Sequence, residues 1–170
     1  MRRFALTRHM AVLLFLLCAA ALSTVFVVAA HAEPGLQSNL IAISGQGTGH
    51  VNVSPTAHDE GDTVFIAQGT AEIHDALPNT TYVVQRAVDF TPNDGVCTIA
   101  PAPPAGWLSL TTFTTSPAGA RAGHFERVSS PPGPSGFQFD IIFRVVKQNG
   151  DGSLDLSQVL MSACMTVTVK

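Results

Sequence analysis

FQFDIIFRVVK, residues Phe137–Lys147, is the stretch that decides the fold. Apolar and polar side chains alternate along it, which is the period of a β-strand whose two faces meet different surroundings. One face carries Phe137, Phe139, Ile141, Phe143 and Val145, and the other carries Gln138, Asp140 and Arg144, with Ile142 and Val146 as apolar exceptions. The pattern predicts a half-buried strand with its polar face turned outward.

The segment that follows this strand is KQNGDGSLDLSQ, Lys147–Gln158. It resembles a calcium-binding loop, but with Gly152 at the sixth position a lysine and a glutamine stand where calcium needs carboxylates. Asn-Gly and Asp-Gly tolerate positive φ and are strong hairpin signals. We therefore predict a hairpin turn, which pairs the strand with the chain leading to Cys164.

Several other segments have strand character, and none shows a convincing helical period. The candidates are residues 50–54, 62–68, 69–75, 81–90, 107–115 and 123–128, and a C-terminal strand in which Met165, Val167 and Val169 share a face. Turn-forming clusters separate them at intervals of about 8–12 residues, which is typical of sandwiches and barrels. The prediction is an all-β protein with a single antiparallel β-sandwich of about seven to nine strands.

LPNTTY, Leu77–Tyr82, stands before one of these strands. With Pro78 and Thr80 placed four and two residues ahead of Tyr82, it resembles the tyrosine corner of fibronectin type III and related immunoglobulin-like sandwiches. The resemblance implies an immunoglobulin-like fold in which the tyrosine side chain hydrogen-bonds back to the preceding corner. It implies nothing about activity, because this fold carries many unrelated functions.

The N-terminal segment has the features of a secretory signal peptide. Arg2, Arg3 and Arg8 precede an uncharged run from Met10 to Ala30, and Ala30-His31-Ala32 offers a small-residue cleavage site. We expect cleavage after Ala32 and a secreted protein, extracellular or periplasmic, with no membrane association afterwards. Because the run is about 20 residues long, enough to span a bilayer, an uncleaved signal anchor is the alternative.

This prediction divides the chain into three segments. Residues 1–32 are the signal peptide, residues 33–48 a lead-in, and residues 49–170 the β-sandwich domain. A short first strand at Asn39–Ile43 is the alternative within the lead-in.

The charge of the chain beyond the leader argues against nucleic-acid binding. The whole sequence has 9 Lys and Arg and 12 Asp and Glu, and the leader contains no acidic residue but three of the basic ones. The remaining basic side chains are scattered singly: Arg86, Arg121, Arg127, Arg144, Lys147 and Lys170. They form no basic footprint for a phosphate backbone.

Two of the three cysteines, Cys97 and Cys164, lie beyond the leader. In an oxidising compartment such an isolated pair is most simply a disulfide, and neither cysteine has the neighbours that a zinc site needs. Because Cys97 lies in a loop-like stretch and Cys164 opposes the parity of the apolar C-terminal face, we expect the bridge to pin that loop to a sheet edge or outer face. Trp107, in the same region, is expected in the core.

The histidines suggest metal binding as an alternative function. Glu72 and His74 should share the outer face of one strand, and His50 should face outward from another. If these strands are neighbours, the side chains could bind copper or zinc, together with His58 or His124. The alternative interpretation is scattered surface histidines, one of them paired with Glu72.

No catalytic motif is present. SGQGTG, Ser44–Gly49, lacks the following helix of a dinucleotide site and is interpreted as a loop. The leading hypothesis is an exported, non-catalytic module with a binding or structural role, no cofactor, and an unknown protein or glycan partner. Its expected binding loops are Thr91–Gly106 and Ser129–Gly136. A metal-binding envelope protein is the second hypothesis and an enzyme the third, and the oligomeric state stays open.

Overall fold

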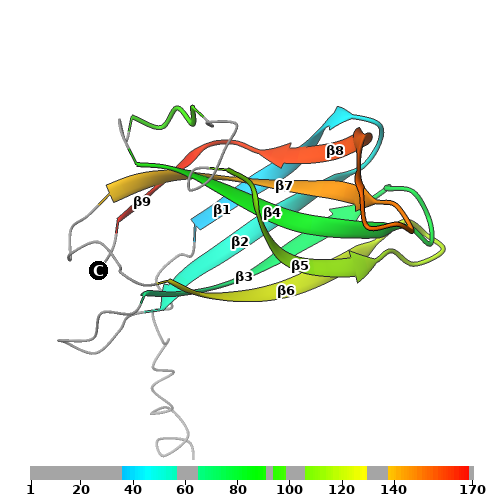
Figure 1. Cartoon of the computed structure of the whole chain (residues 1–170), viewed down its shortest axis with the longest axis horizontal. Coiled ribbons are helices and arrows are strands. Elements are labelled where there is room, and N and C mark those ends of the chain that lie inside the picture. Colours follow the sequence, from blue (N-terminus) through cyan, green and yellow to red (C-terminus); the bar gives the residue numbers. More distant parts are fainter. Residues whose placement is uncertain (1–35, 57–64, 91–93, 99–105, 130–137, 169–170) are drawn as a thin grey trace, which may run out of the picture. The chain divides into compact units, whose positions relative to one another are not determined.

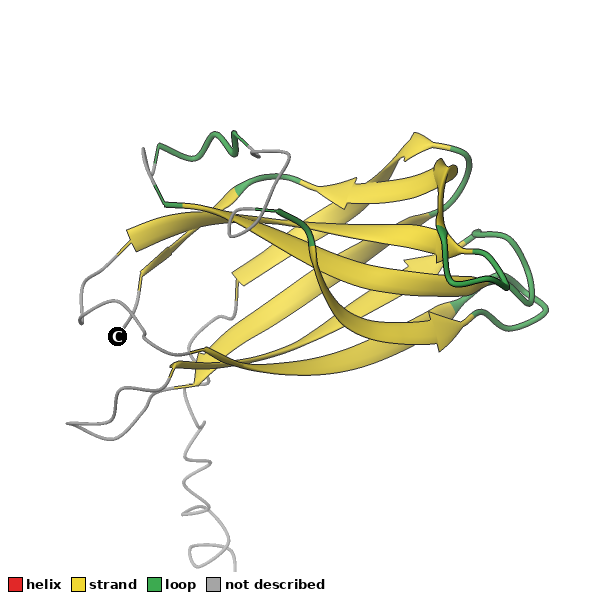
Figure 2. Cartoon of the chain, viewed as in Figure 1, coloured by secondary structure: helices red, strands yellow, loops and turns green. Residues whose placement is uncertain are grey.

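Nine antiparallel strands form one nearly closed sheet in the computed structural model, which describes residues 36–56, 65–90, 94–98, 106–129 and 138–168 (Figures 1 and 2). The all-β class is confirmed, whereas the predicted signal peptide lies outside the described residues. None of the described segments is a helix that could cross a membrane. The strands are β1 Leu36–Ser44, β2 Thr48–Thr56, β3 Phe65–His74, β4 Thr81–Asp89, β5 Leu108–Thr114, β6 Arg121–Ser129, β7 Gln138–Gln148, β8 Leu154–Ser162 and β9 Met165–Thr168.

The two end strands of the sheet are consecutive in the chain, so their connection brings the ends of the sheet together. The order is β5-β4-β7-β8-β1-β2-β3-β6, and a turn joins β5 directly to β6. In that turn the Ser116 amide donates to Ala120 O at 3.0 Å. Just beyond it, a Cβ on Gly123 would lie 2.4 Å from the Phe113 ring, so β5 and β6 come close there. The two strands form no ladder with each other, and this leaves the sheet nearly closed (Figure 1).

β7 is the most enclosed strand of the sheet. It pairs with β4 along one edge, and with β8 and then β9 along the other. Its predicted apolar face points into the core, where Phe143 and Val145 are almost completely buried. Ile142 and Val146, the exceptions in the pattern, are also buried although they lie on the outer face. β7 is therefore buried on both faces, whereas the sequence predicted a strand with one buried apolar face and one exposed polar face.

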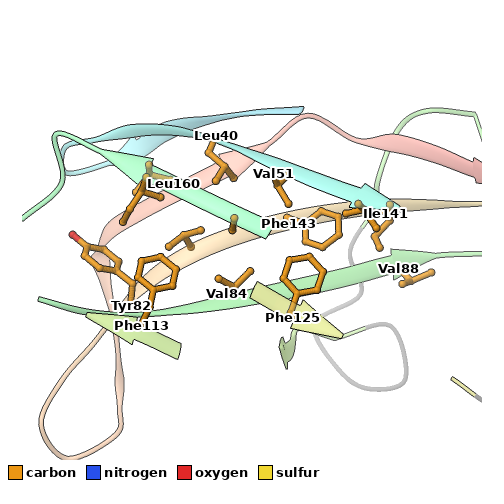
Figure 3. Close-up of a cluster of buried hydrophobic side chains, with 14 of the residues drawn as sticks. Leu40, Val51, Tyr82, Val84, Val88, Phe113, Phe125, Ile141, Phe143 and Leu160 are labelled. Atoms are coloured by element: carbon orange, nitrogen blue, oxygen red, sulfur yellow. The ribbon is translucent and has the colours of Figure 1, made fainter. Parts of the chain in front are cut away.

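The core fills the inside of the curled sheet with aromatic and branched side chains (Figure 3). Phe125 of β6 stacks on Phe143 of β7 with ring centroids 5.9 Å apart. Tyr82 of β4 lies 6.3 Å from Phe113 of β5. Tyr82 and Phe113 are partners on neighbouring strands, whereas Phe125 and Phe143 connect β6 and β7, which are not hydrogen-bonded to each other, so this second pair ties opposite parts of the sheet together.

Two strands were predicted at residues 62–68 and 69–75, but the described residues 65–74 form the single strand β3, so the separate assignment was wrong. Gly69 does not form a turn between them. It lies within β3 opposite Phe125, whose ring would come within 2.3 Å of a Cβ at this position. Glycine is needed here because the aromatic ring packs directly on the backbone.

The lead-in predicted at residues 33–48 contributes a full strand. β1 pairs with β2 on one side and β8 on the other, so the alternative first strand at Asn39–Ile43 is present and is longer than expected. Gly45 and Gly47, from the expected loop, have φ of 76° and 117° and form the turn between β1 and β2. Positive φ explains the glycines at these positions.

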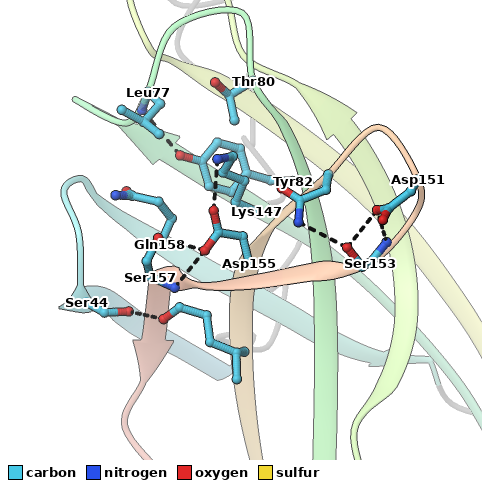
Figure 4. A network of polar contacts seen from close by, with 12 residues as sticks. Ser44, Leu77, Thr80, Tyr82, Lys147, Asp151, Ser153, Asp155, Ser157 and Gln158 are labelled. Carbon is cyan, nitrogen blue, oxygen red and sulfur yellow. Dashed lines mark hydrogen bonds and ion pairs between the residues drawn. The ribbon is translucent and has the colours of Figure 1, made fainter.

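The corner before β4 has the hydrogen bond that the tyrosine-corner resemblance implies (Figure 4). The Leu77 amide donates to the Tyr82 hydroxyl at 3.3 Å, and Tyr82 is fully buried. Thr115 secures the same corner, since its Oγ1 donates to Leu77 O at 2.6 Å and accepts from the Thr80 amide at 2.9 Å. Asn79, with φ of 48°, makes the tight turn between them.

The segment between β7 and β8 is the predicted hairpin turn (Figure 4). The Gly152 amide donates to Asn149 O at 2.9 Å. Asp151 accepts hydrogen bonds from the backbone and hydroxyl of Ser153, and Asp155 accepts from Ser157 and Lys147. The hydroxyl of Ser157 and the amine of Lys147 lower the pKa of Asp155 to about 2. The carboxylates that suggested calcium thus stabilise the turn itself.

Cys97 and Cys164 form a disulfide with a Cα–Cα distance of 5.6 Å. Cys164 lies in the break between β8 and β9, so the bridge fastens residues 94–98 to the outer side of the sheet, as expected from its parity. Asp140 of β7 was expected in a polar, outward position but is completely buried. Its two carboxylate oxygens accept from the Gly95 amide at 2.8 Å and the Thr166 hydroxyl at 2.6 Å, because the loop lies against this face.

Replacing Tyr82 by phenylalanine should destabilise the protein by about 1 kcal/mol, because the Leu77 amide loses its acceptor. Burial is the main cause that raises the pKa of Tyr82 above 10.0, so the folded state favours the neutral phenol. That preference is fully present below pH 10 and is lost as the pH rises through the folded pKa. Tyr82 is the chain's single tyrosine, so absorbance titration reads it directly.

In denaturant unfolding we expect the original protein to lose stability above pH 10 more steeply than the Tyr82→Phe variant. The control is Thr112→Ala, on the exposed side of β5, which should change neither the stability nor its dependence on pH. A Tyr82 that titrates at the value of free tyrosine would contradict the buried corner.

Candidate functional site

The outer face of β2, β3 and β6 carries a continuous set of polar side chains. Successive strands pair in register there, with His50 opposite Glu72 and Thr70 opposite His124. Side chains directly opposite each other in antiparallel strands share a face and lie within contact distance. The alternation of each strand, buried inward and polar outward, therefore assembles these groups on one surface.

Glu72 lies between two histidines on this surface. Its Oε1 is 3.0 Å from His74 Nε2, and its Oε2 is 3.5 Å from His50 Nε2. The predicted common face of Glu72 and His74 and the predicted outward direction of His50 are both present in the structure. All three side chains remain more than one-third exposed, so their attraction is screened by water.

His124 does not join this group. His124 Nδ1 is 2.9 Å from the hydroxyl of Thr70. His58 lies outside the described residues. In the described part of the chain, no group of three or more His, Cys, Asp or Glu side chains is arranged to hold a metal ion. The two imidazole nitrogens lie near different oxygens of the Glu72 carboxylate, whereas a metal needs its ligand atoms to converge on one point.

Thr70 and His124 also bear on the enzyme hypothesis. A hydroxyl within hydrogen-bonding distance of an imidazole is the first part of a nucleophilic site, and the base is normally oriented by a third group. Among the described residues, no carboxylate bonds to the second ring nitrogen of His124. Within the described residues, the pair therefore has no third group that orients the imidazole.

An open hollow of about 480 Å³ lies next to these histidines on the same face. We call it the polar hollow, and its lining residues are Asn52, Ser54, Gln68, Gly69, Thr70, His124, Phe125 and Glu126. The Gln68 amide donates to Glu126 Oε2 at 2.7 Å across the strands. The side chains of Asn52 and Ser54 are exposed and make no hydrogen bond within the described residues. They are free to bond to a ligand.

Sequence reasoning missed the polar hollow because it considered the histidines alone. Gly69 was a usable signal, since a glycine within a strand often marks a close approach of backbone or ring. The predicted binding loops, Thr91–Gly106 and Ser129–Gly136, lie largely outside the described residues, apart from 94–98, Gly106 and Ser129.

Trp107 is not part of the core cluster, and its predicted core position was wrong. It is half-buried on the outer side of the sheet, where the Arg144 guanidinium lies 4.0 Å from its ring centroid. Arg144 Nε also donates to Gln85 Oε1 at 2.8 Å, and the Gln85 amide donates to Ser109 at 3.0 Å. Burial lowers the pKa of Arg144, and the aromatic ring compensates by a cation–π contact.

No protein-family model, curated protein or solved structure matches this chain. The geometry of the described residues therefore has to carry the functional argument.

Proposed function

We propose that this chain is an exported, non-catalytic β-domain that binds a glycan through the polar hollow. The observation that carries the proposal is the hollow itself, a site built from the outward side chains of three paired strands. Its volume of about 480 Å³ falls within the range of about 300–1,000 Å³ that is common for ligand sites.

The chemistry of the lining suits a hydroxyl-rich ligand. The hollow offers an amide in Asn52, hydroxyls in Ser54 and Thr70, an imidazole in His124 and a carboxylate in Glu126. Together these groups both donate and accept hydrogen bonds, as sugar hydroxyls require. No lysine or arginine lines the hollow, which disfavours a phosphate ligand. None of the large apolar side chains exposed in the described residues lies there either, which disfavours an apolar peptide anchor.

Export is the second part of the proposal, supported by the leader sequence and the disulfide. A bridge between Cys97 and Cys164 is compatible with an extracellular or periplasmic location, because disulfides persist in oxidising compartments. The immunoglobulin-like type is supported by the bond from Leu77 to Tyr82. We expect mass spectrometry of the exported protein to find Glu33 at its N-terminus. Retention of residues 1–32 would favour the signal-anchor alternative.

A glycan array followed by calorimetry of the bound sugars tests the binding proposal. Asn52→Ala and Glu126→Gln should each weaken binding by about tenfold, the equivalent of one lost hydrogen bond of about 1.4 kcal/mol. Thr112→Ala is the matched control, since it removes an exposed hydroxyl from the outer face of β5, away from the hollow.

Two results would contradict the proposal. One is the absence of any glycan ligand for the folded domain. The other is a bound glycan whose affinity is the same in the original protein and in both hollow variants, which would place its site elsewhere.

A further inference from the structure

Arg86 is a cation on the inner side of the sheet. It alternates along β4 with the same side as Tyr82, Val84 and Val88, all of which belong to the core. Its register partners are Phe143 on β7 and Leu108 on β5. The guanidinium is consequently held among apolar neighbours, and it is partly shielded from water.

Arg127 of β6 faces the same side. It follows Phe125 by two residues and pairs in register with Ala67, and both of these side chains contact the core. Unlike Arg86, it is exposed. Phe143, the register partner of Arg86, stacks on Phe125, so the two arginines approach each other across the core. Burial lowers the pKa of Arg86, and the charge of Arg127 lowers it further.

The two arginines lie toward the ends of β5 and β6 that are far from their connecting turn. Leu108 is the first residue of β5, and Arg127 is close to the last residue of β6. Near the turn, Gly123 packs against Phe113, but no ladder joins the two strands. Arg86 is only partly buried, so part of its side chain is in contact with solvent.

Among the described residues, no acidic side chain balances the charge of either arginine. Within the described part of the chain, no hydrogen bond or ion pair involves Arg86 or Arg127. Arg144, the other half-buried arginine, has both Trp107 and Gln85. An unpaired, partly desolvated cation beside a like charge destabilises a fold unless something neutralises it.

We propose that Arg86 and Arg127 bind an oxyanion, a carboxylate or phosphate group, at the open edge between β5 and β6. A guanidinium presents a planar fork of donors that matches the two oxygens of such a group, and two guanidiniums can share one anion. The anion would remove the repulsion between the two arginines. This site faces the inside of the sheet, whereas the polar hollow lies on its outside, so the inference is independent of the glycan proposal.

Thermal unfolding and NMR with inorganic phosphate or acetate, at constant ionic strength made up with chloride, test this site. Either anion should raise the melting temperature and shift the Nε–H signal of Arg86. The Arg86→Gln and Arg127→Gln variants should each bind phosphate and acetate with an apparent affinity at least tenfold lower than that of the original protein. Arg121→Gln is the control, an exposed arginine near the start of the same strand as Arg127, and it should respond as the original protein does.

A purely structural arginine would behave differently from an anion-binding one. Without added oxyanion, Arg86→Gln should melt no lower than the original protein, because the substitution removes an unpaired charge. If Arg86→Gln fails to fold, the loss of anion affinity can still be measured in the Arg127→Gln variant, because Arg127 is exposed. The proposal is overturned if neither anion changes the melting temperature or the Arg86 signal, or if the control loses affinity as much as the two variants.

Discussion

Burial of β7 on both faces is the constraint on which the rest of the structure depends. Its inner face packs in the core, and its outer face holds the buried Ile142 and Val146. Both edges are paired, so its backbone groups are satisfied within the sheet. A strand of this kind needs a second layer outside the sheet. Residues 94–98 supply part of that layer, fixed by the disulfide and by Asp140, and Trp107 stacked on Arg144 adds to it.

Because only one part of the outer surface is covered, the two halves of the sheet differ in the exposure of their outer side chains. The outer sides of β4, β7 and β8 are occupied by the chain itself, as the buried Val83 and Val159 show. The outer sides of β2, β3 and β6 remain polar and accessible, and there the cross-strand register builds the histidine–carboxylate group and the polar hollow. The seam where β5 and β6 approach without pairing is the third consequence, since it leaves Arg86 near an open edge.

Alternation along the chain predicted most of the strands, because burial on one side imposes a period of two. It failed where a residue had an unusual neighbour from elsewhere in the chain. Gly69 was taken as a boundary because the ring of Phe125 that requires it lies more than fifty residues away. Asp140 was placed in solvent because the covering loop cannot be inferred from its own strand. For the site, the common face of Glu72 and His74 followed from parity, whereas the position of His50 opposite Glu72 depends on register between strands, which the sequence does not specify.

Native-state hydrogen exchange of the backbone amides tests the central role of β7 most directly. If β7 is the strand enclosed on both faces and both edges, the amides of Ile141–Val145 should exchange only through global unfolding. The amides of β5 and β6 that face the unpaired seam should exchange earlier, through local opening. Amides of β7 that exchange as readily as those along the seam would contradict the account.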